Sequence, residues 1–233
     1  MSKTILDENS VGNLCGGQLT VVFNTESIWH YRRNETYRRF VTECQNIAID
    51  GVGLLLALRL KGHRVHRYHG PDLCNDILVR GPSREQQVLI VGGNPANDTL
   101  ATKGLVQGFL PLPIVNSTED FESVFADLER FFLAFCGQKV VLVSLGLPKQ
   151  ELFCSWLLKR LESSRSLDKD EFVLLPVGAA LDFITGERTR SGKAWQRIGL
   201  EWLPRLVREP RMFIRVYRSF VALISLVLLQ PRN

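Results

Sequence analysis

The stretch KVVLVSLGLPKQELFCSWLLKRLE, residues 139–162, decides the fold of this chain. Its first part, Lys139–Leu145, is an apolar run rich in Val and Leu and is typical of a buried strand. Gly146 ends this run, and Pro148 suits the first position of an amphipathic helix over Lys149–Glu162. A buried strand that leads through a glycine turn into a helix indicates an α/β protein.

The same alternation of strand and helix patterns continues on both sides of this stretch. Further strands are predicted at Gln18–Phe23, Asn46–Asp50, Val65–Tyr68, Val88–Val91 and Phe172–Val177. Further helices are predicted at Ser27–Cys44, Val52–Lys61, Asp72–Arg80, Asn97–Val106 and Glu119–Phe135. These elements predict a Rossmann-like, open and mostly parallel sheet with helices on both faces, in which binding residues lie at the carboxyl ends of the strands.

Composition excludes several classes of protein. The 233 residues are 45% hydrophobic and 23% charged, which fits a globular core and not a disordered chain. The five cysteines are odd in number, scattered and without a C-x-x-C pair, so a disulfide scaffold and a zinc finger are both disfavoured and a reducing cytosol is expected. Residues 1–10 lack the apolar run of a signal peptide, and the longest apolar run, Phe220–Leu229, is about half of a bilayer span.

Positive charge is concentrated at the C-terminal end. Residues 184–233 hold ten Lys or Arg against three acids, whereas the whole chain has a net charge of only +5. We therefore expect a catalytic domain over residues 1–185 and a basic, helical C-terminal appendage over residues 186–233. In a helix, Arg211, Arg215 and Arg218 form one basic stripe, largely on a different side from the apolar residues that continue to Leu229, which suits a segment lying in a membrane interface. An ordinary terminal helix packed on the core is the alternative.

Two strand ends carry residues suited to chemistry. Asp50 directly follows the apolar stretch Asn46–Ile49 and precedes a predicted helix, so it is either a general base at the edge of the sheet or a cap of that helix. Gly92, Gly93 and Asn94 follow the strand Val88–Val91 and would let backbone N–H groups approach a nucleotide, although a plain turn is equally consistent. Neither a G-x-G-x-x-G fingerprint nor a P-loop is found in the sequence.

Two more strand ends complete the candidate site. After Gly146, the residues Lys149, Gln150 and Glu151 share one helix N-terminus and form a potential anion site with hydrogen-bonding groups. Asp182 follows the last strand and either binds substrate or forms a cap or salt bridge within the fold. The sequence Asp168-Lys169-Asp170 precedes its strand and is interpreted as a solvated loop, and His63, His66 and His69 surround a predicted strand without forming a metal site.

Several short motifs occur in the order found in a known family. They are Asn24-x-Glu26, Asp50-Gly51-x-Gly53, Gly70-x-Asp72-Leu73, Gly92-Gly93, Gly146-x-Pro148-Lys149-Gln150-Glu151, Val177-Gly178-Ala179 with Asp182-Phe183 and Gly186, Trp195, Gly199-Leu200-Glu201-Trp202-Leu203, Arg205-Leu206 and Glu209-Pro210-Arg211. In these motifs the chain resembles the WecG/TagA/CpsF glycosyltransferases of bacterial envelope polysaccharide synthesis, from about Leu19 to Tyr217.

This resemblance implies an activity and a set of site residues. Such enzymes move N-acetylmannosamine, its uronic acid or glucose from a UDP donor to a polyprenyl-diphosphate-linked saccharide, with inversion and without an essential metal or other cofactor. It implies that Asp50 is the catalytic base. The expected nucleotide-binding residues are Gly92, Gly93, Asn94, Gly146, Lys149, Gln150 and Glu151, the expected sugar or acceptor residues are Asn24, Gly51 and Asp182, and the expected diphosphate-binding residues are Arg205, Arg211 and Arg215.

The resemblance also implies a place in the cell and leaves some questions open. A peripheral protein on the cytoplasmic face of the membrane is expected, without a nucleic-acid partner; self-association is left open. The family usually has a threonine, a proline and an Ala-Pro pair where this chain has Val22, Thr25 and Ser191-Gly192, so the transferred sugar stays undetermined. A nicotinamide-dependent oxidoreductase and a non-catalytic membrane-surface scaffold are the alternatives, and Asp50 is a residue that a scaffold would not need.

Overall fold

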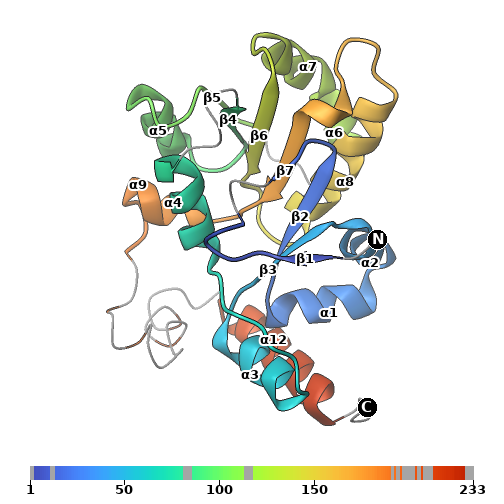
Figure 1. The fold of residues 1–233 in the computed structure, drawn as a ribbon, viewed down its shortest axis with the longest axis vertical. Coiled ribbons are helices and arrows are strands. Elements are labelled where there is room, and N and C mark those ends of the chain that lie inside the picture. The colour runs from blue at the N-terminus through green and yellow to red at the C-terminus, as the bar shows by residue number, and fades with distance from the viewer. Residues whose placement is uncertain are drawn as a thin grey trace.

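The computed structural model describes residues 3–10, 14–80, 86–112, 118–189 and 212–228, together with the single residues 192, 195, 203 and 206. Its centre is a seven-stranded sheet in the order β1-β3-β2-β7-β6-β4-β5, in which every paired strand is parallel (Figure 1). The strands are β1 Thr4–Ile5, β2 Gln18–Phe23, β3 Asn46–Ile49, β4 Gln86–Val91, β5 Gly108–Leu110, β6 Gln138–Val143 and β7 Phe172–Pro176. The predicted open parallel α/β sheet is confirmed.

Helices cover both faces of this sheet, as predicted. They are α1 Thr25–Arg33, α2 Glu35–Glu43, α3 Val52–Leu60, α4 Gly70–Arg80, α5 Asp98–Thr102, α6 Thr118–Ser123, α7 Phe125–Leu133, α8 Lys149–Glu162, α9 Ala180–Thr185 and α12 Met212–Leu228, with short 3-10 helices η2 Pro95–Asn97 and η3 Lys169–Glu171. Helices α2, α6, α7 and α8 lie on one face, and α4, α5 and α9 lie on the other (Figure 1).

The apolar strands explain why both faces must be covered. In β6, Val141 and Val143 belong to the core under α2 and α8, whereas Val140 and Leu142 belong to the core under α4 and α9. Side chains of a strand alternate between faces, so a continuous apolar strand needs an apolar helix layer on each side. Because both faces are covered, these strands are continuous apolar runs, and this pattern allowed them to be predicted from the sequence.

Two of the predicted elements are wrong. Residues Val65–Tyr68 form no strand; β3 pairs with β1 and β2, and the Tyr68 N–H donates a hydrogen bond to the Ile49 carbonyl at the end of β3. The predicted helix Ser27–Cys44 is two helices, because Asn34 has an extended backbone and its side chain accepts a hydrogen bond from the Tyr37 N–H, which starts α2.

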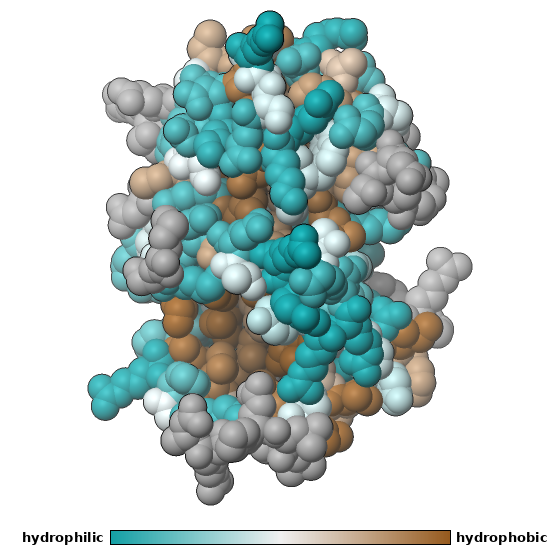
Figure 2. Space-filling model, turned by 90° about the vertical axis from the view of Figure 1, so that its right-hand side faces the viewer, coloured by the Kyte–Doolittle hydropathy of each residue, from teal (hydrophilic) through white to brown (hydrophobic). Residues whose placement is uncertain are grey.

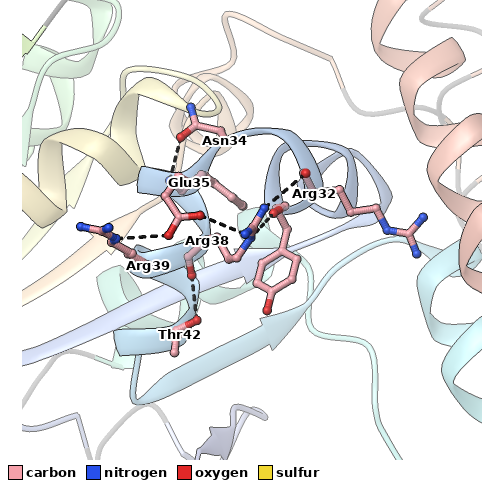
Figure 3. A network of polar contacts seen from close by, with 8 residues as sticks. Arg32, Asn34, Glu35, Arg38, Arg39 and Thr42 are labelled. Atoms are coloured by element: carbon pink, nitrogen blue, oxygen red, sulfur yellow. Dashed lines mark hydrogen bonds and ion pairs between the residues drawn. The ribbon is translucent and has the colours of Figure 1, made fainter.

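The break at Asn34 is reinforced by the polar network in Figure 3. Glu35 forms ion pairs with Arg38 and Arg39 at 2.9 and 3.3 Å. The Arg38 guanidinium also donates to the backbone carbonyls of Tyr31 and Arg32, in the last turn of α1. Such terminal carbonyls have no partner within their own helix. Arg38, a residue of α2, thus satisfies the carbonyls at the end of α1 and links the two helices.

Other differences are smaller. The predicted helix Glu119–Phe135 is divided into α6 and α7 near Val124, and the one predicted over Asn97–Val106 ends early, before Gly104 with its φ of +71°. Pro148 is the residue before the first turn of α8 and not its first member. Strands β1 and β5, of two and three residues, were too short to be predicted.

Helix α12 packs on the sheet side that carries the catalytic candidate. Helix α12 lies beside α1 and α3 (Figure 1). Ala222 of α12 is buried with Ile28 of α1, Ile49 of β3 and Leu54 of α3. Within the described part of the chain, no helix is both long and apolar enough to cross a membrane. Residues 212–228 thus form a helix that contacts the α/β core, and Arg215 and Arg218 of this helix lie at the edge of the sheet.

Candidate functional site

A cavity of about 500 Å³ opens at the carboxyl edge of the sheet. Its walls include residues that follow the four neighbouring strands β3, β2, β7 and β6, namely Asp50, Asn24, Gly178 and Gly146. Parallel strands end at the same edge of a sheet, so residues far apart in the sequence meet there. Seven of the predicted site residues line this cavity, namely Asn24, Asp50, Gly51, Gly146, Gln150, Glu151 and Arg215.

Asp50 lies at this edge and does not cap the following helix. Its Oδ1 accepts a hydrogen bond from the Gly51 N–H at 2.7 Å, and Gly51 itself occupies the cap position of α3 with no side-chain cap. Gly51 has a φ of +84°, a conformation that favours glycine. The side chain of Asp50 is 25% exposed and lines the cavity, which is the arrangement that a general base needs.

His69 is a site residue that the sequence analysis missed. Its Nδ1 lies 2.7 Å from Asp50 Oδ1, and its side chain lines the same cavity. The segment that carries it reaches the end of β3 through a hydrogen bond from the Tyr68 N–H to the Ile49 carbonyl, at 2.8 Å. The available signal was its position directly before the Gly70-x-Asp72-Leu73 motif, where α4 begins.

Two arginines of α12 line the cavity, and a buried carboxylate holds them. The Arg215 Nε lies 2.8 Å from Glu26 Oε2, and an Arg218 nitrogen lies 3.9 Å from Glu26 Oε1. Glu26 is buried, whereas Arg215 is half exposed. Of the three predicted diphosphate-binding arginines, Arg215 thus lies at the site; Arg205 and Arg211 lie outside the described residues.

Gln150 and Glu151 form a buried polar pair in the cavity wall. The Gln150 Nε2 donates to Glu151 Oε1 at 2.9 Å, and both side chains are buried. Burial raises the pKa of Glu151 to about 8, the charge of Glu26 adds to the rise, and the Gln150 hydrogen bond opposes it. Glu151 is therefore mostly a neutral acid at pH 7. Among the described residues, Gln150 Oε1 and Glu151 Oε2 have no hydrogen-bond partner.

Asn24 caps helix α1 and also lines the cavity. Its Oδ1 accepts from the Ser27 N–H at 3.0 Å, and the Ser27 hydroxyl accepts from the Asn24 N–H at 3.1 Å, so the two residues form a reciprocal cap of α1. This cap fixes the side chain at the rim of the cavity. The next residue of the family motif, Glu26, is positioned by the same turn.

Other predicted residues lie away from this cavity. Gly92 and Gly93 follow β4, and a Cβ atom on either would come within 2.6 Å of Leu145 or Ser144, so these glycines allow close contact with the end of β6. Asn94 caps η2. Neither these three residues nor Lys149 line the cavity. Their assignment to a nucleotide stays a prediction.

Asp182 and Asp168 have partners within the fold. Asp182 is buried, lies outside the cavity wall, and forms an ion pair with Arg188 at 2.9 Å, as the structural alternative anticipated. Asp168 and Asp170 are exposed in the loop before β7, where Asp168 caps η3. Over the described ranges, no group of three or more His, Cys, Asp or Glu side chains has the arrangement of a metal site.

An apolar groove of about 250 Å³ continues from the cavity between α3 and α12. It shares Asn24, Glu26, Gly51, Val52 and Arg215 with the cavity and extends along the apolar side chains of α12. These side chains are Met212, Val216, Phe220 and Leu223. The groove therefore has a polar, arginine-containing end at Asp50 and an apolar end along the C-terminal helix.

A parallel sheet with its polar residues at the carboxyl edge is the architecture of α/β enzymes that bind a ligand at this edge. The comparison with protein families identifies the class further. The model of the WecG/TagA/CpsF family of glycosyl transferases matches residues 8–233, and the chain belongs to this family. Membership supports a transferase over the oxidoreductase and scaffold alternatives.

Proposed function

We propose that the protein is an inverting glycosyltransferase that moves a hexose derivative from a UDP donor to a polyprenyl-diphosphate-linked saccharide. N-acetylmannosamine, its uronic acid and glucose are the candidate sugars. The observation that carries the proposal is Asp50 at the end of β3, in one cavity with two arginines of α12. An inverting displacement requires one base on the acceptor side and positive charge near the leaving diphosphate, and this cavity offers both.

The chemistry assigned to these residues is a single displacement. Asp50 takes the proton of the acceptor hydroxyl while the acceptor oxygen bonds to the anomeric carbon, and the bond from that carbon to the diphosphate breaks. Arg215 and Arg218 balance the negative charge that develops on the UDP. Guanidinium groups can supply the charge that a divalent cation supplies in other transferases, so we expect no metal requirement.

The other end of the cavity suits the donor. The buried pair Gln150 and Glu151 offers two side-chain oxygens that have no hydrogen-bond partner among the described residues, and Gly146 lines the same cavity. A neutral Glu151 presents both a donor and an acceptor, as recognition of a base or a sugar amide needs. A substrate that lacks the matching polar group would leave these buried oxygens unpaired, which costs binding free energy. The site therefore selects a substrate that carries this group.

The surface near α12 suits peripheral attachment to a membrane. Phe213, Ile214 and Tyr217 of α12 are exposed, and so is Leu60 of α3, which is 73% exposed. Figure 2 shows hydrophobic residues gathered in the lower half of the molecule, at the level of α1, α3 and α12 in Figure 1. An apolar helix surface with arginines at its polar side fits a position in the membrane interface, with the groove open toward a lipid-linked acceptor.

One assay tests the proposed function directly. The full chain is incubated with membranes or a synthetic polyprenyl-diphosphate-linked acceptor and a panel of UDP-sugars, and the product mass and anomeric configuration are determined. We expect one sugar to be added with inversion. The D50N variant is the matched control, because it keeps the shape of the residue and loses the base. A product that retains the donor configuration, or no product with any donor, would contradict the proposal.

A further inference from the structure

The two hydrogen bonds that hold the Asp50 carboxylate both end on the same oxygen. The Gly51 N–H and the His69 Nδ1 each lie 2.7 Å from Oδ1. Within the described residues, no hydrogen bond ends on Oδ2. One oxygen is therefore fixed by the protein, and the other is left for a ligand in the cavity.

The backbone places His69 firmly beside this carboxylate. The preceding residue, Tyr68, donates its N–H to the Ile49 carbonyl at 2.8 Å, and the His69 carbonyl accepts the Leu73 N–H at 2.9 Å, in the first turn of α4. The side chain of His69 is only 16% exposed. The ring is thus anchored between the end of β3 and the start of α4.

The chemistry of the two groups sets the direction of the hydrogen bond. An ionised carboxylate can only accept, so the proton of this contact belongs to Nδ1 of His69. This arrangement resists rotation of the Asp50 carboxylate, which a single bond from the Gly51 N–H would not prevent.

We propose that His69 is a positioning residue for the base Asp50, an inference that rests on the proposed function. His69 holds Oδ1, so that Oδ2 meets the acceptor hydroxyl. In the reaction the hydroxyl proton moves to Oδ2, the acceptor oxygen bonds to the anomeric carbon, and the UDP leaves with the electrons of the broken bond. His69 keeps its proton throughout, and Asp50 later releases its new proton to water.

A kinetic comparison of H69L and H69N tests this role. Loss of the donor in H69L should lower kcat about tenfold to a hundredfold, since a small misplacement of a reacting group costs about a hundredfold, with the KM for the UDP-sugar unchanged. Asn can place its amide nitrogen where Nδ1 lies, so H69N should keep kcat within about threefold of the wild type. H66L is the matched control, because His66 is an exposed residue of the same segment and lies outside the cavity wall.

A second background separates positioning from a general structural effect. In D50N no carboxylate is left to be positioned. Adding H69L to D50N should therefore lower the residual rate by less than twofold, because the effects of two residues that act together are not additive. The same fold-loss in both backgrounds, or a fully active H69L, would overturn the proposal. A deficient H69N would overturn the hydrogen-bond donor as its cause.

A spectroscopic arm does not depend on turnover. In protein labelled with ¹⁵N-histidine, one of the four histidines should show a protonated Nδ1, and this signal should vanish in H69N. An Nε2-protonated tautomer at His69 would overturn the proposal even in an active enzyme. If wild-type protein shows the expected signal but transfers no sugar from any donor, the proposed function fails, and with it the catalytic role of the pair.

Discussion

Replacing Glu151 by Gln should stabilise the protein, by an amount that grows with pH. Glu151 is fully buried in the cavity wall, and its burial, together with the charge of Glu26, raises its pKa to about 8 from an ordinary value of 4.5. Between these two values the folded protein keeps a proton that the unfolded chain has released. The free energy of unfolding therefore falls as the pH rises through this window, and the loss is complete above the folded pKa.

The size of this effect follows from the difference between the two pKa values. At about 1.4 kcal/mol for each unit, the rise from 4.5 to about 8 corresponds to roughly 5 kcal/mol. Gln has the shape of the protonated acid and can still accept from the Gln150 Nε2. We expect E151Q and the wild type to be equally stable near pH 4, and the variant to gain about 1.4 kcal/mol with each pH unit until the gain levels off above pH 8.

Urea unfolding of both proteins between pH 4 and pH 9, followed by circular dichroism, measures this difference. E162Q is the matched control, because Glu162 is an exposed residue of the same helix, paired with Lys169 at the surface. The free energy of unfolding of E162Q should change with pH in the same way as that of the wild type. If the free energies of unfolding of E151Q and the wild type also change in parallel from pH 5 to pH 8, Glu151 ionises like a surface carboxyl. The proposal that a protonated Glu151 binds the donor is then refuted.

Three further outcomes are expected. D50N should lose about a hundredfold to ten-thousandfold in kcat but still bind UDP in calorimetry, and more than a tenth of the wild-type turnover would exclude Asp50 as the base. Activity should persist in excess EDTA; a full loss that Mg²⁺ or Mn²⁺ restores would mean that the arginines do not suffice at the diphosphate. The double variant F213S/I214S removes two exposed apolar side chains of α12, so it should sediment less with anionic liposomes and keep the wild-type melting temperature, whereas unchanged sedimentation would place the membrane contact elsewhere.

The parts of the fold that were predictable are those whose signal is local. Strand β2 and helix α8 have the predicted boundaries, because a strand buried on both faces and a helix that follows a glycine turn carry their pattern in consecutive residues. The place of Asp50 was predictable for the same reason, since it follows its strand directly. The break at Asn34 was missed, although its signal is also local, because Asn is a favoured N-cap.

The parts that were missed depend on contacts between distant residues. His69 lies 19 positions after Asp50, and their pairing depends on a backbone hydrogen bond from Tyr68 to the end of β3. Arg215 and Glu26 are 189 positions apart. The pattern of apolar residues within a single segment does not show which distant segment it will contact. The sequence analysis placed candidates at the ends of β3, β6 and β7, which line the cavity, and at the end of β4, which does not. The structure adds which side chains contact one another there.

Glu26 explains why the cavity and the C-terminal helix belong together. It is a buried carboxylate whose charge contributes to the raised pKa of Glu151, so it needs a counter-charge to be stable in this position. Arg215 and Arg218 supply that charge when α12 lies against α1 and α3. The same contact places both guanidinium groups in the wall of the cavity that contains Asp50. The packing of α12 against α1 and α3 therefore also provides the positive charge of the site.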